Sequence, residues 1–283
     1  MITYKLGTEV EKKDIHKAFH MGFIDYIMKV DIPEQVFFKR FFGPEGNAFD
    51  LSVVAYDGNE PVGLLLGGIK PFDGGALTMR CGGLCVVPEF RGKGISQTLM
   101  NMHREMAVSR GCKQIMLEVI GGNDRAIQFY KKIGYHVIYQ LDYYSIQGKE
   151  LKAGKLTNAL VVDIELDQME SVKEWISDTH VNWQNDFEYI SGLDGIVKYG
   201  IFENEKLISF LIADRKGKVY LLWTQQDMRF KGYASYLLNH FQKTLEIEKI
   251  MMSFPNSATL TGFVKSVGFV KDELYQYEMY GLI

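Results

Sequence analysis

A short glycine-rich segment, Arg91-Gly92-Lys93-Gly94-Ile95-Ser96, follows a strand-like apolar run and precedes a helical pattern. In such a turn, several backbone N–H groups collect at the start of the helix with few side chains in the way. These groups and the positive end of the helix dipole attract an anion, and glycine lets a phosphate come close. The segment therefore predicts a phosphate-binding turn, although ordinary tight connections can have the same pattern.

The spacing of these glycines argues against two common nucleotide sites. The chain has no Gly-x4-Gly-Lys-Ser/Thr segment, which a Walker-type phosphate loop requires,. It also lacks a Gly-x-Gly-x-x-Gly segment after a first strand, which marks dinucleotide binding,. With these two patterns excluded, we interpret the turn as a pyrophosphate-binding site of another kind.

The elements that would position this turn occur twice in the chain. Arg229-Phe230-Lys231-Gly232-Tyr233-Ala234 repeats the pattern Arg-x-x-Gly-x-small 138 positions later, again after an apolar run. A helix follows each copy, with apolar residues on one face at a period of 3.6. Those positions are Ile95, Leu99, Met102 and Met106 in the first copy, and Ala234, Leu238, Phe241 and Leu245 in the second.

Two further landmarks repeat in the same order. Residues 54–66 and 200–210 both read as β-hairpins, the first with a turn at Asp57-Gly58-Asn59,. Downstream, Phe129-x4-Gly134-Tyr135 is echoed by Phe263-x4-Gly268-Phe269. A chain of 283 residues also exceeds the roughly 250 residues at which single cores stop growing,. We therefore predict a duplicated α/β unit, with domains at 1–146 and 156–283 and a polar connection between them.

Composition and charge limit the function classes. Apolar residues make up 47% of the chain and charged residues 24%, as in soluble globular proteins,. A net charge of −3 gives no basic footprint for nucleic acid, and no run resembles a signal peptide or a membrane span,. We expect a cytoplasmic protein that binds neither nucleic acid nor membrane.

The three cysteines are too few and too irregular for a disulfide framework or a zinc site,. On an unbroken strand, Cys81 and Cys85 would share one face. We interpret these two residues and Cys112 as small buried apolar side chains, and we expect no metal.

Three segments together resemble the core of the GNAT acetyltransferase superfamily. They are Val86-Val87-Pro88-Glu89-Phe90-Arg91-Gly92-Lys93-Gly94-Ile95-Ser96, Leu117-Glu118-Val119, and Asn123-Asp124-Arg125-Ala126-Ile127-Gln128-Phe129-Tyr130-Lys131-Lys132-Ile133-Gly134-Tyr135. The resemblance is strongest over residues 84–135 and weaker over 219–269. It implies two tandem GNAT-like domains, each a mixed, mostly antiparallel sheet flanked by helices.

The resemblance also implies acetyl-CoA as cosubstrate, with its pyrophosphate on the glycine turn and its pantetheine arm paired with the preceding strand. Asn123 would contact the arm, or would simply cap the following helix. Ser96 departs from the family pattern, which has Gly or Ala there, but its small hydroxyl can itself bond a phosphate. The implied coenzyme-binding residues are Leu84, Cys85, Val86, Arg91, Gly92, Lys93, Gly94, Ile95, Ser96, Gln97 and Asn123.

Acyl transfer to an amine needs an unprotonated nitrogen and a proton for the departing thiolate. An alkylamine of pKa ~10.4 is free only about once in 2,500 molecules at pH 7, so a base helps. Tyr130 matches the family tyrosine that protonates the thiolate, although an aromatic core residue is the alternative. Glu118 matches the general base of the ribosomal-protein N-terminal alanine acetyltransferases, which this segment resembles; a solvated strand residue is the alternative.

In the second domain the same alignment places Val264 at the position of Tyr130 and Met252 at that of Glu118. We expect this domain to be catalytically degenerate, although its turn keeps the binding pattern. The acceptor, a small-molecule or peptide amine, should enter beside Phe19, Phe23, Asp25, Tyr26 and the aromatic run over 37–42, with Asp25 attracting a cationic amine. A non-catalytic acyl-CoA-binding or sensor protein is the competing function, and a homodimer is the assembly considered.

Overall fold

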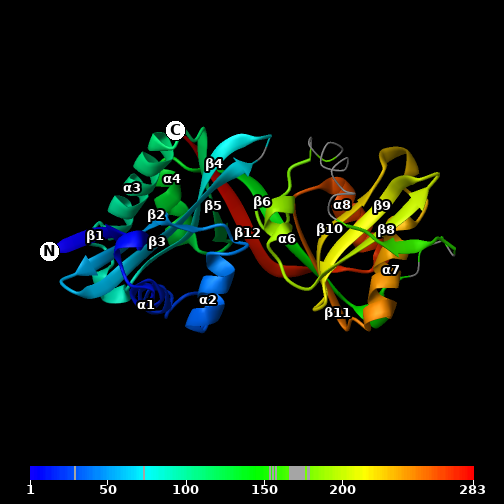
Figure 1. The fold of residues 1–283 in the computed structure, drawn as a ribbon, viewed down its shortest axis with the longest axis horizontal. Helices are drawn as coiled ribbons and strands as arrows, with labels where there is room; N and C mark the ends of the chain where they lie inside the picture. Colours follow the sequence, from blue (N-terminus) through cyan, green and yellow to red (C-terminus); the bar gives the residue numbers. More distant parts are fainter. Residues whose placement is uncertain are drawn as a thin grey trace. The chain divides into compact units, whose positions relative to one another are not determined.

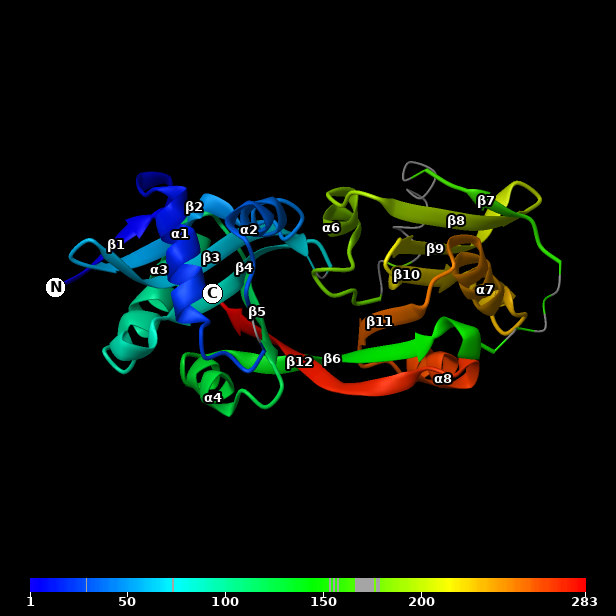
Figure 2. The same cartoon turned by 90° about the horizontal axis from the view of Figure 1, so that it is seen from below.

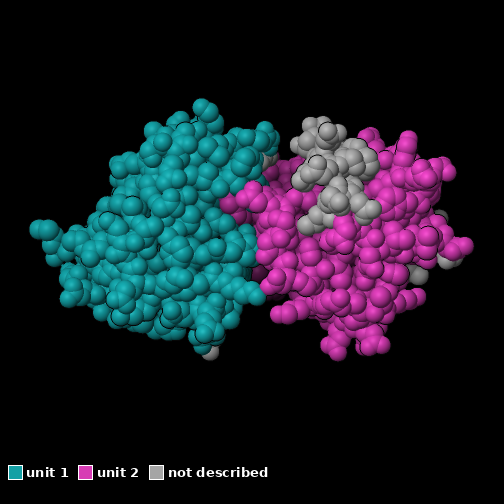
Figure 3. All heavy atoms as spheres, viewed as in Figure 1, with its two compact units in different colours: residues 1–138, 277–283 teal, residues 139–276 magenta. Residues whose placement is uncertain are grey.

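The computed structural model describes residues 1–283 except 29, 73, 153, 155, 157, 166–175, 177 and 178. The chain forms two compact units, which Figure 3 shows in different colours. Unit 1 comprises residues 1–138 and 277–283, and unit 2 comprises residues 139–276. Each contains a mixed sheet with helices packed against it, which confirms the predicted fold class.

Unit 1 is built on a sheet with strand order β1-β2-β3-β4-β5-β12 (Figure 1). Strands β1 to β4 pair in antiparallel fashion, and β4 pairs with β5 in parallel. Its elements are β1 Ile2–Leu6, the 3-10 turn η1 Gly7–Glu9, α1 Lys12–Gly22, α2 Glu34–Phe41, β2 Ala48–Asp57, β3 Glu60–Phe72, β4 Ala76–Val86, the 3-10 turn η2 Pro88–Phe90, α3 Ile95–Ser109, β5 Gln114–Ile120 and α4 Asp124–Lys132.

Helices cover both faces of this sheet. Helices α3 and α4 pack on one face through a core that includes Leu99, Ile127 and Tyr130. Helices α1 and α2 pack on the other face through Ile15 and Phe37. The predicted hairpin turn lies between β2 and β3, where Gly58 has a φ of +60°, a conformation that glycine adopts without strain,.

Unit 2 repeats this plan, with strand order β12-β6-β11-β10-β9-β8-β7 (Figure 2). Helices α7 and α8 pack on one face of its sheet and α6 on the other. Its elements are β6 His136–Gln147, the 3-10 turn η3 Gly148–Glu150, β7 Val161–Asp163, α6 Phe187–Ser191, β8 Ile196–Glu203, β9 Lys206–Asp214, β10 Lys218–Thr224, the 3-10 turn η5 Gln226–Met228, α7 Tyr233–Leu245, β11 Lys249–Pro255, α8 Ala258–Val267 and β12 Val270–Leu282.

The units divide the chain at other residues than the predicted 1–146 and 156–283. Most of β6 belongs to unit 2, whereas residues 277–283 at the end of β12 return to unit 1. There Met279 joins the core of unit 1, and Arg104 of α3 donates to the carbonyl of Leu282 at 2.7 Å. The prediction places the boundary in the polar connection between residues 146 and 156. It does not allow for residues 277–283, at the C-terminal end of the chain, which add a strand segment to unit 1.

Within the described residues, no helix combines the length and the apolar composition needed to cross a bilayer.

Candidate active site

The predicted phosphate-binding turn leads into α3 as expected. Gly92 and Gly94 have φ values of +76° and +80°, and a Cβ added at either would meet no atom within 4 Å. The first intrahelical hydrogen bond runs from the N–H of Thr98 to the carbonyl of Gly94 at 3.1 Å. The N–H groups of the three preceding residues thus have no acceptor within the helix. Because Ile95 buries its side chain, it offers only its backbone to a ligand.

Beside this turn, β4 and β5 part. Their parallel pairing runs from Thr78↔Gln114 to Cys81↔Leu117, although β4 continues to Val86 and β5 to Ile120. The opening carries the predicted residues 84–86 on one strand and Glu118 on the other. Backbone groups on facing edges that no longer pair can bond an extended ligand.

A β-bulge at Gly82 changes which faces the cysteines occupy. The pairing of β3 with β4 shifts between Leu66↔Gly83 and Gly67↔Cys81, so Gly82 is the extra residue. As a result Cys81 lies in the core under α3, whereas Cys85 lies in the core under α1. The expectation of a shared face is wrong because a bulge interrupts the alternation of side chains.

Tyr130 is buried on α4, 8% exposed, in the same core as Cys81. Burial raises the pKa of its phenol well above the usual value, and the neighbouring ionisable groups of Cys81, Tyr135, Tyr26 and Cys85 add to the effect. The phenol therefore keeps its proton at neutral pH.

Glu118 is held by Arg80, a residue that the sequence did not single out. Arg80 donates from Nε to Oε2 of Glu118 at 3.0 Å and also binds that oxygen through Nη2. Its Nη1 donates to Oε2 of Glu45 at 3.0 Å. The three side chains are 3 to 6% exposed. Burial disfavours the charged guanidinium, but the two carboxylates outweigh it and raise the pKa of Arg80 above its usual value.

The side chain of Arg91 is bound within the fold. Its guanidinium binds both carboxylate oxygens of Asp25 and donates to the carbonyls of Gly22 and Val86. The expectation that Asp25 is available to attract a cationic amine is wrong, because Arg91 already occupies that carboxylate. Lys93 is exposed, with Nζ 4.5 Å from the ring centroid of Phe90.

Two other predicted features have structural roles. Asn123 caps α4, where its side-chain oxygen accepts the N–H of Ala126 at 3.2 Å, and its side chain also interacts with Tyr26. The aromatic residues of α1 and α2 form a buried cluster, with ring centroids of Phe19 and Phe37 4.6 Å apart. Phe19 and Phe37 are therefore core residues, and Phe23, Phe38, Phe41 and Phe42 pack against them while partly exposed.

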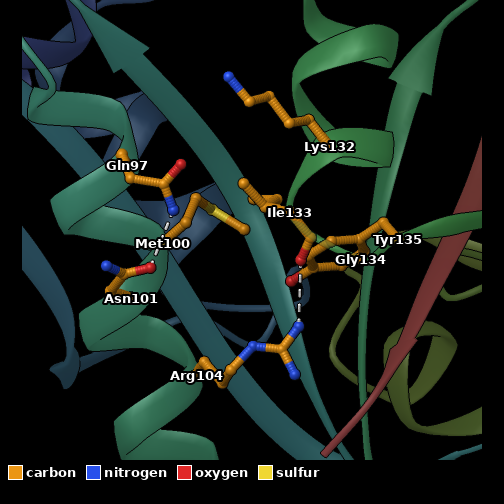
Figure 4. Close-up of a pocket in the computed structure, with 8 residues that line it drawn as sticks. All are labelled: Gln97, Met100, Asn101, Arg104, Lys132, Ile133, Gly134 and Tyr135. Carbon is orange, nitrogen blue, oxygen red and sulfur yellow. Dashed lines mark hydrogen bonds between the residues drawn. The ribbon is translucent and has the colours of Figure 1, made fainter.

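A cavity of about 440 Å³ begins at Gln97, in the first turn of α3. Figure 4 shows Gln97 and Asn101 on α3 facing Lys132 and Ile133 at the end of α4. Neither of the two predicted proton-handling groups, Tyr130 and Glu118, lines this cavity, which reaches the start of α3 at Gln97.

Unit 2 keeps the glycine turn but has no counterpart of the side chains of Tyr130 and Glu118. Gly232 precedes α7 with a φ of +99°, and Phe230 takes the position of Gly92 with a φ of +65° and a fully exposed side chain. Val264 and Met252 are both buried in the apolar core of this unit. Across the described residues, no group of three His, Cys, Asp or Glu side chains is arranged to hold a metal ion.

Comparison with known proteins agrees with this geometry. Residues 11–135 match the model of the acetyltransferase (GNAT) family. An acetyltransferase of Sodalis glossinidius is 36% identical over 88 residues, which are 31% of this chain and 58% of that protein. The match thus spans less than two thirds of that relative. Residues 11–135, less than half of the chain, are thus similar to the GNAT acetyltransferase family.

Two solved structures have the same fold over nearly the whole chain. A GCN5-related N-acetyltransferase from Sphaerobacter thermophilus has a TM-score of 0.69 at 12% identity and covers 99% of this chain and 95% of its own. A tandem GNAT protein from the clavulanic acid biosynthesis pathway has a TM-score of 0.67 at 14% identity, covering 100% and 98%. At such identities the similarity concerns the fold alone.

Proposed function

We propose that unit 1 transfers an acetyl group from acetyl-CoA to a primary amine of a small molecule or peptide. One arrangement carries this proposal. The opening between β4 and β5 leads directly to the glycine turn of α3, and Tyr130 lies in the same core as Cys81 and Leu117, the last pair before the strands part. A thioester lying in the opening would have a diphosphate anchor at one end and a proton donor at the other.

The residues present fit this cosubstrate, which when bound supplies an activated thioester. The amides of Ile95, Ser96 and Gln97 would hold the diphosphate, and the hydroxyl of Ser96 would add a donor. Because the carbonyl of Val86 already accepts from Arg91 at 2.9 Å, Leu84 and Cys85 would provide the main backbone contacts to the arm. The cavity at Gln97 would accept the nucleotide end, with Lys132 favouring a phosphate,.

In this proposal Tyr130 protonates the departing sulfur. At ordinary pKa values, near 8.5 for a thiol and 10 for a phenol, the transfer costs about 2 kcal/mol. Burial raises the pKa of Tyr130, but it also destabilises a thiolate in the same surroundings, so only the difference between them matters,. The phenol remains a hydrogen-bond donor throughout the working pH range.

Glu118 acts as the base in this proposal. Since Oε2 is bound to Arg80, Oε1 is the oxygen that would receive a proton from the amine nitrogen. A bound ammonium ion first loses one proton, which passes to solvent. The lone pair of the neutral amine then forms the C–N bond with the thioester carbon, the C–S bond breaks, Oε1 takes the proton that this nitrogen loses, and Tyr130 supplies a proton to the sulfur. Exchange with solvent returns both side chains to their starting states.

Unit 2 would not catalyse the reaction, since Val264 and Met252 can neither donate nor accept a proton. This assigns one catalytic centre to the chain. The other candidate is an acyl-CoA-binding or sensor protein that does not catalyse transfer. It is favoured by the glycine turn, a predicted binding feature, because each unit has one.

The test is release of free thiol when the protein is mixed with acetyl-CoA and spermidine, glucosamine or a short peptide with a free amino group. We expect turnover with at least one amine, and Tyr130→Phe should lower it at least tenfold. Tyr135→Phe is the matched control, because it removes a buried phenol with no hydrogen-bond partner among the described residues. Equal losses from both variants would contradict the role of Tyr130, and binding without turnover would favour the sensor.

A further inference from the structure

Two buried oxygens lie without a hydrogen-bond donor at the point where β4 and β5 part. They are Oε1 of Glu118 and Oδ1 of Asn47, neither of which has a partner in the described part of the chain. Both side chains are 5% exposed. A buried acceptor without a partner costs roughly 1–3 kcal/mol, so two of them in this part of the fold call for a ligand with N–H or O–H groups.

The orientation of Asn47 is fixed by the end of α2. Its Nδ2 donates to the carbonyl of Phe41 at 2.8 Å, and its backbone N–H donates to the same oxygen at 3.1 Å. Because a carbonyl only accepts, the side-chain nitrogen must be the atom that faces Phe41. Oδ1 is therefore turned toward the sheet.

Glycine lets this oxygen reach the strands. Oδ1 lies 2.1 Å from where a Cβ of Gly82 would be. Likewise, the carbonyl oxygen of Gly46 lies 2.2 Å from where a Cβ of Gly68 on β3 would be. Any side chain at Gly82 would displace the amide of Asn47. The bulge residue thus has a second role, which is to leave room for an acceptor above β4.

Glu118 stands opposite this position. Gly82 and Glu118 each follow the last pair of the ladder, Cys81↔Leu117, where the two strands begin to part. Arg80, anchored by Glu45, holds Oε2 of Glu118 and leaves Oε1 unbound. The two acceptors thus lie over neighbouring strand positions, beside the opening between the strands.

We propose that Oδ1 of Asn47 and Oε1 of Glu118 together bind the nitrogen of the acceptor as a primary or secondary ammonium ion. This deepens the proposed acetyltransferase function and depends on it. Two acceptors, one of them a carboxylate, are complementary to a cation with at least two N–H donors. A hydroxyl has one donor and a tertiary ammonium has one, so either would leave one acceptor unpaired. Asn47 is then a specificity-determining residue and Arg80 a positioning residue.

The first test uses the amine with the highest turnover among spermidine, glucosamine and the short peptide. Asn47→Ala should raise the KM for that amine at least tenfold, leave the KM for acetyl-CoA within twofold, and change kcat less than threefold. Asn239→Ala is the control, since its Nδ2 also donates to a backbone carbonyl, that of Ser235 at 2.9 Å. If Asn47→Ala leaves the amine KM unchanged, or raises both KM values alike, the inference is wrong and a trapped water satisfies these oxygens.

Glu118→Gln provides a second variant that keeps the shape of the side chain. Because Arg80 only donates, the amide oxygen must face it, which places an N–H₂ group where Oε1 stood. A donor would then face the ammonium, and we expect the amine KM to rise at least tenfold while the calorimetric Kd for acetyl-CoA stays within twofold. An unchanged amine KM would contradict the proposal.

The pH dependence of KM distinguishes the charged from the neutral amine. This test uses spermidine, an alkylamine of pKa ~10.4, whose neutral fraction rises about tenfold per pH unit between pH 6 and 9. If the ammonium ion binds, the amine KM should stay nearly constant over this range; a tenfold fall per unit would overturn the assignment. Failure of the wild-type protein to bind acetyl-CoA in calorimetry would instead refute the proposed function itself.

Discussion

The guanidinium of Arg91 binds the carboxylate of Asp25 through two hydrogen bonds, from Nη1 to Oδ2 at 2.6 Å and from Nη2 to Oδ1 at 2.7 Å. Its Nε donates to the carbonyl of Val86 at 2.9 Å, and Nη2 also donates to that of Gly22 at 3.2 Å. Arg91 therefore links the end of α1 to the end of β4, just before the glycine turn. It stabilises the turn and is not a free charge for the phosphate.

This linkage predicts unequal effects of its two partners on stability. Asp25→Asn should lower the free energy of unfolding by at most about 1 kcal/mol, because exposed ion pairs contribute little. Arg91→Ala should lower it by about 1–3 kcal/mol, because it leaves the carbonyls of Gly22 and Val86 without this donor. Urea unfolding measures both values, and equal losses would show that only the ion pair matters.

A charge placed in the glycine turn should identify the unit that binds the coenzyme. Gly94→Asp should raise the Kd for acetyl-CoA about tenfold, since a carboxylate would repel the diphosphate at the helix start. Gly94→Asn is the neutral control and should change Kd much less, because Asn and Asp tolerate positive φ about equally. Isothermal titration calorimetry gives the values.

Gly232→Asp makes the same change in unit 2, where Gly232 also precedes a helix with positive φ. We expect it to leave the Kd nearly unchanged. If Gly232→Asp weakens binding and Gly94→Asp does not, acetyl-CoA binds in unit 2, and the assignment of the site to unit 1 is incorrect.

His103 should make the protein less stable in mild acid. It is fully buried in α3, and burial lowers its pKa to about 4, with a further contribution from the charge of Arg104. Between that value and the ordinary 6.5 the unfolded chain binds the proton and the folded chain does not. Stability is therefore lost as pH falls from about 6.5 to 4, by on the order of 3 kcal/mol.

His103→Leu should flatten this part of the stability profile. Urea unfolding at pH 4.5, 5.5 and 6.5 would compare the two proteins, and the variant should show the smaller loss at low pH. Identical pH profiles would mean that another group accounts for the acid sensitivity.

The local features of this fold were predictable from the sequence. Glycines at positions that need positive φ, a period of 3.6 in the residues after Gly94, and the Asp57-Gly58-Asn59 turn each depend on neighbours in the chain. The structure has the helix at Ile95–Ser109 and the hairpin between β2 and β3 where these signals predict them. The same signals also revealed the duplicated plan.

The polar cluster of Arg80, Glu45 and Glu118 could not be predicted from local sequence patterns. Arg80 is 38 positions from Glu118 and 35 from Glu45, and only the register of the sheet brings them together. Asn47 gave no signal, because its role depends on a missing side chain at Gly82. A distinctive feature nearby was the pair of double glycines, at 67–68 and 82–83: backbone carbonyls closely approach the first pair, and the side chain of Asn47 closely approaches Gly82.

By itself, the sequence determined the resemblance to the GNAT family, the glycine turn and the candidate proton-handling residues, because each depends on residue types at short, fixed spacings. Only the tertiary structure decided that Arg91 is bound within the fold, that Cys81 and Cys85 face opposite cores, and that the last strand closes the first unit. These outcomes depend on strand register, on a bulge and on long-range packing. Such features arise from the free energy of the whole folded chain, so no local pattern encodes them.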